Sequence, residues 1–200
     1  MAKLQAADLT HLDNLTKMAR AKTFLGREFL TWLWRKAEID GDQLQLRSGE
    51  DQPLRNVRMW VDDRIVLEDL AGVGHVYTMK GGSPSQSPEA AAALAAGKTV
   101  LELKLGLEVD GVGIFLASLR GDQLAPRTLQ LPPLDDHEDL SAEDTLDRRL
   151  ALMDEFVGMM DDLFSKYMEE RTSKSWSASG AQHIKDWIKD RGEILQSLVH

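Results

Sequence analysis

Basic side chains beside an aromatic residue are the groups in this chain whose chemistry points most clearly to a ligand. Arg58, Lys98 and Lys104 fall in or next to segments with strand character. Trp60 is expected to share the sheet face of Arg58, because alternate residues of a strand point the same way. Cations of this kind pair with phosphate oxygens, and an aromatic ring stacks on bases. We therefore predict Arg58, Lys98 and Lys104 as DNA-binding residues. The alternative is the solvated face of a sheet, with nearby glutamates as partners.

The other candidates for chemistry fit structural roles. The Gly-Lys-Thr step at 97–99 ends a helical segment and opens a strand, the reverse of a phosphate-binding loop. Adjacent carboxylates diverge on a strand or a helix, so they make poor metal ligands. The five histidines are scattered without ligand spacing, and no Ser-His-Asp arrangement is supported. The sequence predicts no enzyme, no cofactor and no metal site. The carboxylate pairs considered are Asp62/Asp63, Asp135/Asp136 and Asp161/Asp162.

An unusually apolar helix is predicted over residues 24–36, FLGREFLTWLWRK. Its apolar side chains cover about half of the helix circumference at 100° per residue. Gly26 lies within that face, where a missing side chain lets another backbone come close. Such a helix needs covering on two sides, by its own domain or by a partner. We assign the predicted oligomer interface to this face: Phe29, Leu30, Trp32 and Trp34.

Composition limits the classes of protein to consider. The 200 residues are enough for a sizeable core, and the absence of cysteine excludes disulfides and thiolate sites. No apolar run approaches the length of a membrane span, so a cytoplasmic protein is expected, nucleoid-associated if it binds DNA. The net charge is −9, yet residues 132–170 hold thirteen Asp/Glu against three Lys/Arg. This acidity disfavours non-specific DNA binding overall. It also makes the 135–170 segment a candidate site for a basic protein partner.

The predicted elements define the scaffold. The first forty residues are helical, with Leu9, Leu12, Leu15 and Met18 at helix spacing. Short strands follow from 43 to 80, with a tight turn at 62–63. An alanine-rich helix begins at Ser87-Pro88 and ends at Gly97, because these are favoured capping residues. A leucine-alternating strand over 101–107, a hairpin at 110–111 and two further strands lead to the prolines at 132–133.

Two helices complete the chain. A long helix begins after Ser141, with Asp144 three residues later as a capping partner, and a last helix covers about 180–198. The long helix carries a narrow apolar seam at 4-3-4-3-4-3 spacing, which we expect to pack in the core. Its residues are Leu146, Leu150, Met153, Val157, Met160, Phe164 and Tyr167.

These elements predict an α+β protein. We expect an antiparallel β-sheet in two meanders joined by a crossover helix, packed by N-terminal helices and a long C-terminal helical pair. Residues 1–133 form the sheet domain with its N-terminal helices. Residues 134–200 form a C-terminal helical segment that packs on it, giving one structural unit.

Two segments resemble a known family: FLGREFLTWLW at 24–34 and EAAAALAAGKTVLELKLGLEVDGVGIFLASLRGDQLAPRTLQLP at 89–132. They are similar to the C-terminal portion of the RdgC family of recombination-associated proteins and cover about a third of the chain. The resemblance implies a non-enzymatic protein whose relatives form ring-shaped dimers, bind duplex DNA with little sequence preference and restrain RecA-type recombinases. Lys98 and Lys104 are the positions it transfers. The family's N-terminal half has no counterpart here, and Arg127 is the final strand's only cation.

Two functions from different classes follow. The first is a non-catalytic, RdgC-like accessory in DNA recombination or chromosome maintenance, which acts as a homo-oligomer and binds duplex DNA weakly and without sequence preference. The second is an acidic protein-interaction or structural module with no DNA contact.

Overall fold

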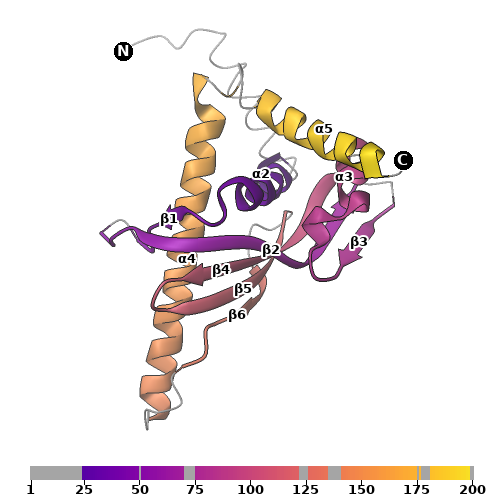
Figure 1. The fold of residues 1–200 in the computed structure, drawn as a ribbon. Coiled ribbons are helices and arrows are strands. Elements are labelled where there is room, and N and C mark those ends of the chain that lie inside the picture. Colours follow the sequence, from indigo (N-terminus) through magenta and orange to yellow (C-terminus); the bar gives the residue numbers. More distant parts are fainter. Residues whose placement is uncertain are drawn as a thin grey trace, which may run out of the picture.

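The computed structural model describes residues 24–49, 51–69, 75–121, 126–134, 141–174, 176 and 181–198. They form an α+β fold in which a six-stranded antiparallel sheet is packed by four α-helices (Figure 1). The predicted helix around Leu9–Met18 lies outside the described residues. Among those described, no helix is both long and apolar enough to cross a membrane. The strands are β1 (Leu44–Leu46), β2 (Arg55–Glu68), β3 (Tyr77–Lys80), β4 (Thr99–Val109), β5 (Gly113–Arg120) and β6 (Pro126–Gln130); the helices are α2 (Phe24–Asp40), α3 (Pro88–Ala95), α4 (Ala142–Thr172) and α5 (Ala181–Leu198), with a short 3-10 turn, η1 (Pro84–Gln86).

The strands form one continuous antiparallel sheet. Its strand order is β1-β2-β4-β5-β6, and β3 pairs with β2 along the same edge as β1. The second predicted meander is present, since β4, β5 and β6 pair in chain order. The first is not, because β1 and β3 both pair with one edge of β2, and β4 pairs with the other. The β4–β5 hairpin turns at 110–111 as predicted, with Gly111 at φ +75°. Glycine adopts this left-handed conformation without the cost that a Cβ would bring.

The predicted crossover helix is α3. Both β3 and β4 run antiparallel to β2 but pair with its opposite edges, so the connection through α3 has to cross β2. Ser87 caps the helix by accepting a hydrogen bond from the Ala90 amide at 3.1 Å, and Pro88 occupies the first turn. Gly97 follows the helix at φ +84°, which ends it as predicted.

The predicted turn at 62–63 is wrong. Asp62 and Asp63 lie inside the fourteen-residue strand β2, at a shift in its register with β4. Two consecutive aspartates are typical of a turn, but here both carboxylates pair with Lys104 of the neighbouring strand. A bulge bends a strand without ending it, and this bulge lets β2 remain one strand where the sequence suggested two.

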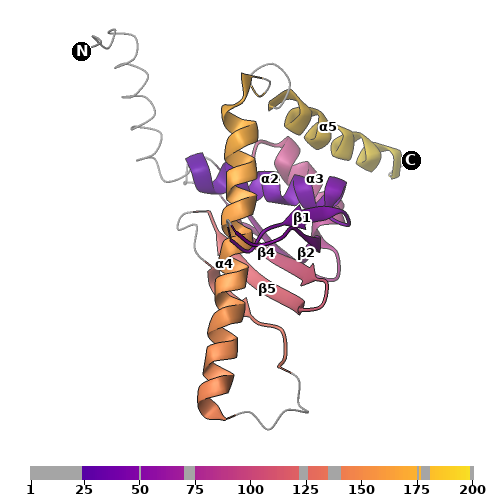
Figure 2. The same ribbon diagram turned by 90° about the vertical axis from the view of Figure 1, so that its left-hand side faces the viewer.

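The helices cover one face of the sheet and enclose the core between them and the strands (Figures 1 and 2). α2 lies nearest the sheet, and Gly26 makes this approach possible, as the sequence predicted. A Cβ at Gly26 would come 2.5 Å from the carbonyl carbon of Gly121. Gly158 has the same role on α4, since a Cβ there would lie 2.9 Å from the Ser48 Cα. Both helices therefore pack directly against backbone.

α4 is the long helix predicted after Ser141, whose hydroxyl accepts a hydrogen bond from the Asp144 amide at 3.1 Å. Its buried face differs from the predicted seam. The seam's first four residues are exposed, whereas Met160 and Phe164 are partly buried and Tyr167 is fully buried, as predicted. The other buried residues of the helix, Phe156, Met159 and Leu163, lie about one position further round. The reason is visible in Figure 2, where the N-terminal half of α4 runs past the sheet.

α5 covers the predicted range but does not form a long pair with α4. It packs against α3 and α2 instead. The rings of Trp34 and Trp187 meet edge to face with centroids 5.6 Å apart, and the Trp187 indole donates a hydrogen bond to Glu38 at 3.2 Å. α2 is therefore covered on one side by the sheet and α4, and on the other side by α5.

Candidate nucleic-acid interface

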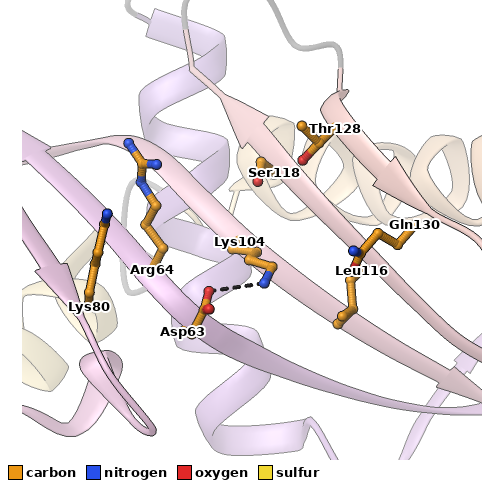
Figure 3. Close-up of a pocket in the computed structure, with 8 residues that line it drawn as sticks. All are labelled: Asp63, Arg64, Lys80, Lys104, Leu116, Ser118, Thr128 and Gln130. Atoms are coloured by element: carbon orange, nitrogen blue, oxygen red, sulfur yellow. Dashed lines mark ion pairs between the residues drawn. The ribbon is translucent and has the colours of Figure 1, made fainter.

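The sheet face opposite the helices carries a polar hollow of about 370 Å³. Figure 3 shows this face, with the hollow's side chains projecting from the strands. Four strands and the end of β3 contribute residues, so the hollow spans most of the sheet. Its lining is Asp63, Arg64, Lys80, Lys104, Leu116, Ser118, Thr128 and Gln130.

Strand register places the hollow's polar residues in a row across the sheet. Lys80 of β3 lies opposite Arg64 of β2. Lys104 of β4 lies opposite Ser118 of β5, which in turn lies opposite Thr128 of β6. Five strands at about 4.8 Å spacing make this row about 19 Å wide. Three cations and two hydroxyls therefore face solvent along one line.

Lys104 is bound by the two aspartates at the β2 bulge. Its ammonium lies 2.8 Å from Asp62 Oδ2 and 3.0 Å from Asp63 Oδ1. The hydrogen bond to Asp62 is the main cause of a raised pKa for Lys104, and partial burial opposes the rise. Lys104 is therefore positively charged at neutral pH but already surrounded by negative charge.

Glu102 lies on β4, in the middle of the sheet, and pairs with two arginines of this face. Only 5% of this residue is exposed, and its two carboxylate oxygens lie 3.2 Å from Arg64 Nε and 3.5 Å from Arg127 Nη1. A buried carboxylate is stable only with such partners. Glu102 thus holds both arginines at the sheet surface while neutralising part of their charge.

Arg58 lies further along the same face, opposite Glu108, and its guanidinium is 3.0 Å from that carboxylate. The guanidinium also sits over the Trp60 ring, 5.3 Å from the centroid, so the predicted sharing of one face is confirmed. Trp60 in turn covers Gly106, where a Cβ would lie 2.8 Å from the ring atom Cδ2. Arg58 and Trp60 form a stacked cation and aromatic pair beside the hollow.

Lys98 is separate from the hollow. It follows α3, where its ammonium lies 2.6 Å from Asp69 Oδ1 and 4.4 Å from the centroid of the Tyr77 ring. Its side chain is only 11% exposed. The structure therefore brings Arg58 and Lys104 to one face and places Lys98 in a local ion pair near the end of the sheet.

The residues predicted at the oligomer interface lie inside the single chain. The exposed fractions of Phe29, Leu30, Trp32 and Trp34 are 4, 1, 0 and 0%. The Trp32 indole donates a hydrogen bond to Glu170 at 2.8 Å, and Phe29 packs edge to face on Phe164 at 5.2 Å. We therefore assign all four to the core, because α4, α5 and the sheet cover this helix on every apolar side.

The remaining sequence candidates have structural explanations. Asp162 accepts hydrogen bonds from the Arg47 amide at 3.0 Å and from Lys166 at 2.6 Å, which docks β1 onto α4. Asp135 and Asp136 lie outside the described residues. Across the described part of the chain, no group of three His, Asp or Glu side chains is placed to hold a metal ion.

Sequence reasoning missed Lys80 and the hydroxyl end of the row. Lys80 is exposed, and it makes no ion pair with any described residue. Its place beside Arg64 depends on the pairing of β3 with β2, which residue spacing alone does not specify. One feature of the sequence did point to this part of the row. Arg64 precedes the apolar Ile65, and alternation along a strand then predicts Ile65 in the core and Arg64 on the solvent face.

Comparison with known proteins gives no family for this fold and site. The chain matches no protein-family model, and no curated protein matches it.

Proposed function

We propose that the protein is a non-catalytic accessory that binds the nucleic-acid backbone weakly, without sequence preference, through the open face of its sheet. The observation that carries the proposal is the row of cations across this face, Lys80, Arg64 and Lys104, flanked by the Arg58–Trp60 stack. Phosphate contacts of this kind give affinity without reading bases. The resemblance to RdgC proteins supports a role in recombination or chromosome maintenance, with duplex DNA as the ligand.

Charge pairing explains why the binding should be weak. Arg58, Arg64, Lys104 and Arg127 are matched by four carboxylates, which leaves Lys80 as the cation best placed for a phosphate; the carboxylates are Asp62, Asp63, Glu102 and Glu108. In a chain of charge −9, this nearly neutral face is where a phosphate meets little repulsion. With one unpaired cation and neighbours that would have to leave a carboxylate, we expect about two or three phosphate contacts at most.

A titration of labelled duplex DNA, read by fluorescence anisotropy, tests the proposal. With two or three contacts, affinity should fall by about ten- to fortyfold between about 50 and 200 mM salt. Two unrelated duplex sequences should bind equally. No binding at the lower salt concentration would sink the proposal.

A charge-reversal pair locates the site. Lys80→Glu should weaken DNA binding by about tenfold or more, because it replaces the unpaired cation with a carboxylate that repels phosphate. Lys185→Glu is the matched control, because Lys185 is exposed on α5, which packs on the helical side of the sheet. Equal losses in both variants would mean that net charge, and not the sheet face, governs binding.

The second candidate function is an acidic protein-interaction module that never contacts DNA. One observation favours it: the cations of the open face other than Lys80 are already paired, while α4 exposes Asp147, Asp154 and Asp161 at seven-residue spacing. A basic helical partner would match such a row. Unchanged DNA anisotropy at low salt, together with saturable binding of a basic amphipathic peptide that Asp154→Lys abolishes, would favour this function.

A further inference from the structure

The N-terminal half of α4 exposes a stripe of large apolar side chains. The exposed fractions of Leu146, Leu150, Met153 and Val157 are 56, 48, 44 and 50%. They are four of the nine large hydrophobic residues that are exposed among the described residues. Single exposed apolar residues are ordinary, but a contiguous row on one helix indicates an interaction surface. We call this row the α4 seam.

The spacing of the α4 seam specifies a helix as its partner. Steps of four, three and four residues place Leu150 and Val157 at heptad position a, and Leu146 and Met153 at position d. The same heptad continues into Phe164, which α2 covers through Phe29. Where this chain supplies a helix, the stripe is packed against it. Over residues 146–157, about 16 Å of helix, no described helix covers the stripe.

The charges beside the seam favour a second copy in parallel orientation. Arg149 occupies position g, and Asp147 and Asp154 occupy position e. In a parallel pair, Arg149 of each copy faces Asp154 of the other, because g contacts the following e position. In an antiparallel pair, Asp147 and Asp154 would face each other twice. The parallel arrangement gains two opposite-charge contacts and contains no like-charge one.

The rest of the molecule permits this arrangement. The buried face of α4, around Phe156 and Leu163, lies roughly 110° around the helix from the seam. A two-fold axis along the helix pair would place the two sheets on opposite sides, away from each other. We propose that two copies of the chain pair through the α4 seam as a parallel, two-fold dimer. This inference is independent of whether the sheet face binds nucleic acid.

Cysteine cross-linking tests the dimer and its orientation, because the chain has no cysteine of its own. Leu150→Cys places a thiol at position a, which faces its own copy across the axis in a parallel pair. Ala151→Cys, exposed and about 100° further around the helix, is the control. Mild oxidation should convert Leu150→Cys to a species of twice 22.4 kDa while Ala151→Cys remains mostly monomeric.

Sedimentation of the unmodified chain supplies the second measurement. Its weight-average mass should rise from 22.4 kDa towards twice that value as the protein is raised to tens of micromolar. Leu150→Asp should remain monomeric, and Ile39→Asp, which changes an equally exposed residue on α2, should behave as wild type. Arg149→Asp should weaken association by about tenfold, and adding Asp154→Arg should restore it.

Several results would overturn the proposal. One is a wild-type chain that stays monomeric throughout; another is a Leu150→Cys variant that cross-links no faster than Ala151→Cys. A third is a full chain that is monomeric while a variant lacking residues 1–23 dimerises, which would show that this segment occupies the seam within one chain.

Discussion

Replacing Gly26 with alanine should destabilise the fold, although alanine is the better helix former. In an exposed helix this change would stabilise by about 1 kcal/mol. Here the new Cβ would lie 2.5 Å from the carbonyl carbon and 2.8 Å from the Cα of Gly121, both backbone atoms that no rotamer change can move. α2 would have to retreat from the end of β5, and overpacking of this kind costs about 3 kcal/mol at the upper end of its range.

The expected net loss is about 2 kcal/mol, which corresponds to a fall in Tm of about 4–8 °C for a domain of this size. Thermal unfolding followed by circular dichroism measures it. Gly82→Ala is the control, because nothing lies within 4 Å of a Cβ there, and its stability should stay within about 0.5 kcal/mol of wild type. A Gly26→Ala variant as stable as wild type, or more stable, would refute the close approach of α2 to the sheet.

Three further predictions concern stability. Burial, with a smaller effect of Glu28, raises the pKa of Tyr167 well above its ordinary value, so this residue's stabilising effect is complete below pH 10 and is lost at higher pH. In urea titrations, the wild type should therefore lose about 1.4 kcal/mol of unfolding free energy by about pH 11, and Tyr167→Phe should not. Equal losses in the two proteins would contradict this. Glu68→Gln should cost about 2 kcal/mol, because the nearly buried Arg27 loses a partner at 2.6 Å, and an unchanged urea midpoint would argue against that pair. Ser87→Ala should lower stability by about 1 kcal/mol through the lost cap of α3, whereas Ser87→Asp, which keeps an acceptor, should not.

Local signals predicted most of the elements. Ser87, Gly97 and Ser141 mark helix ends because their capping chemistry depends only on neighbouring residues, and all three are confirmed. The turn at 62–63 failed for the opposite reason. Asp62 and Asp63 have turn chemistry locally, and only Lys104, more than forty residues away in sequence, keeps them in a strand.

The candidate site was predicted less completely than the fold. Alternation along single strands put Arg58 and Lys104 on the solvent face. The row that joins Lys80 to Thr128, however, depends on the register of five strands, which residue spacing does not determine. Heptad spacing likewise predicted an apolar seam on α4. It could not show which face of α4 the rest of the chain covers, or that the helix begins beyond the sheet, and so it placed exposed residues in the core.

The measurement that tests the nucleic-acid proposal most directly is the affinity of an Asp62→Asn/Asp63→Asn variant for duplex DNA at about 50 mM salt. Removing both carboxylates frees Lys104 for a phosphate, so binding should tighten by about fivefold or more relative to wild type. Asp186→Asn/Asp190→Asn on α5 changes the net charge equally and should leave the affinity nearly unchanged. An equal gain in both variants, or no binding by either the wild type or the Asp62→Asn/Asp63→Asn protein, would contradict the assignment of DNA binding to the open sheet face.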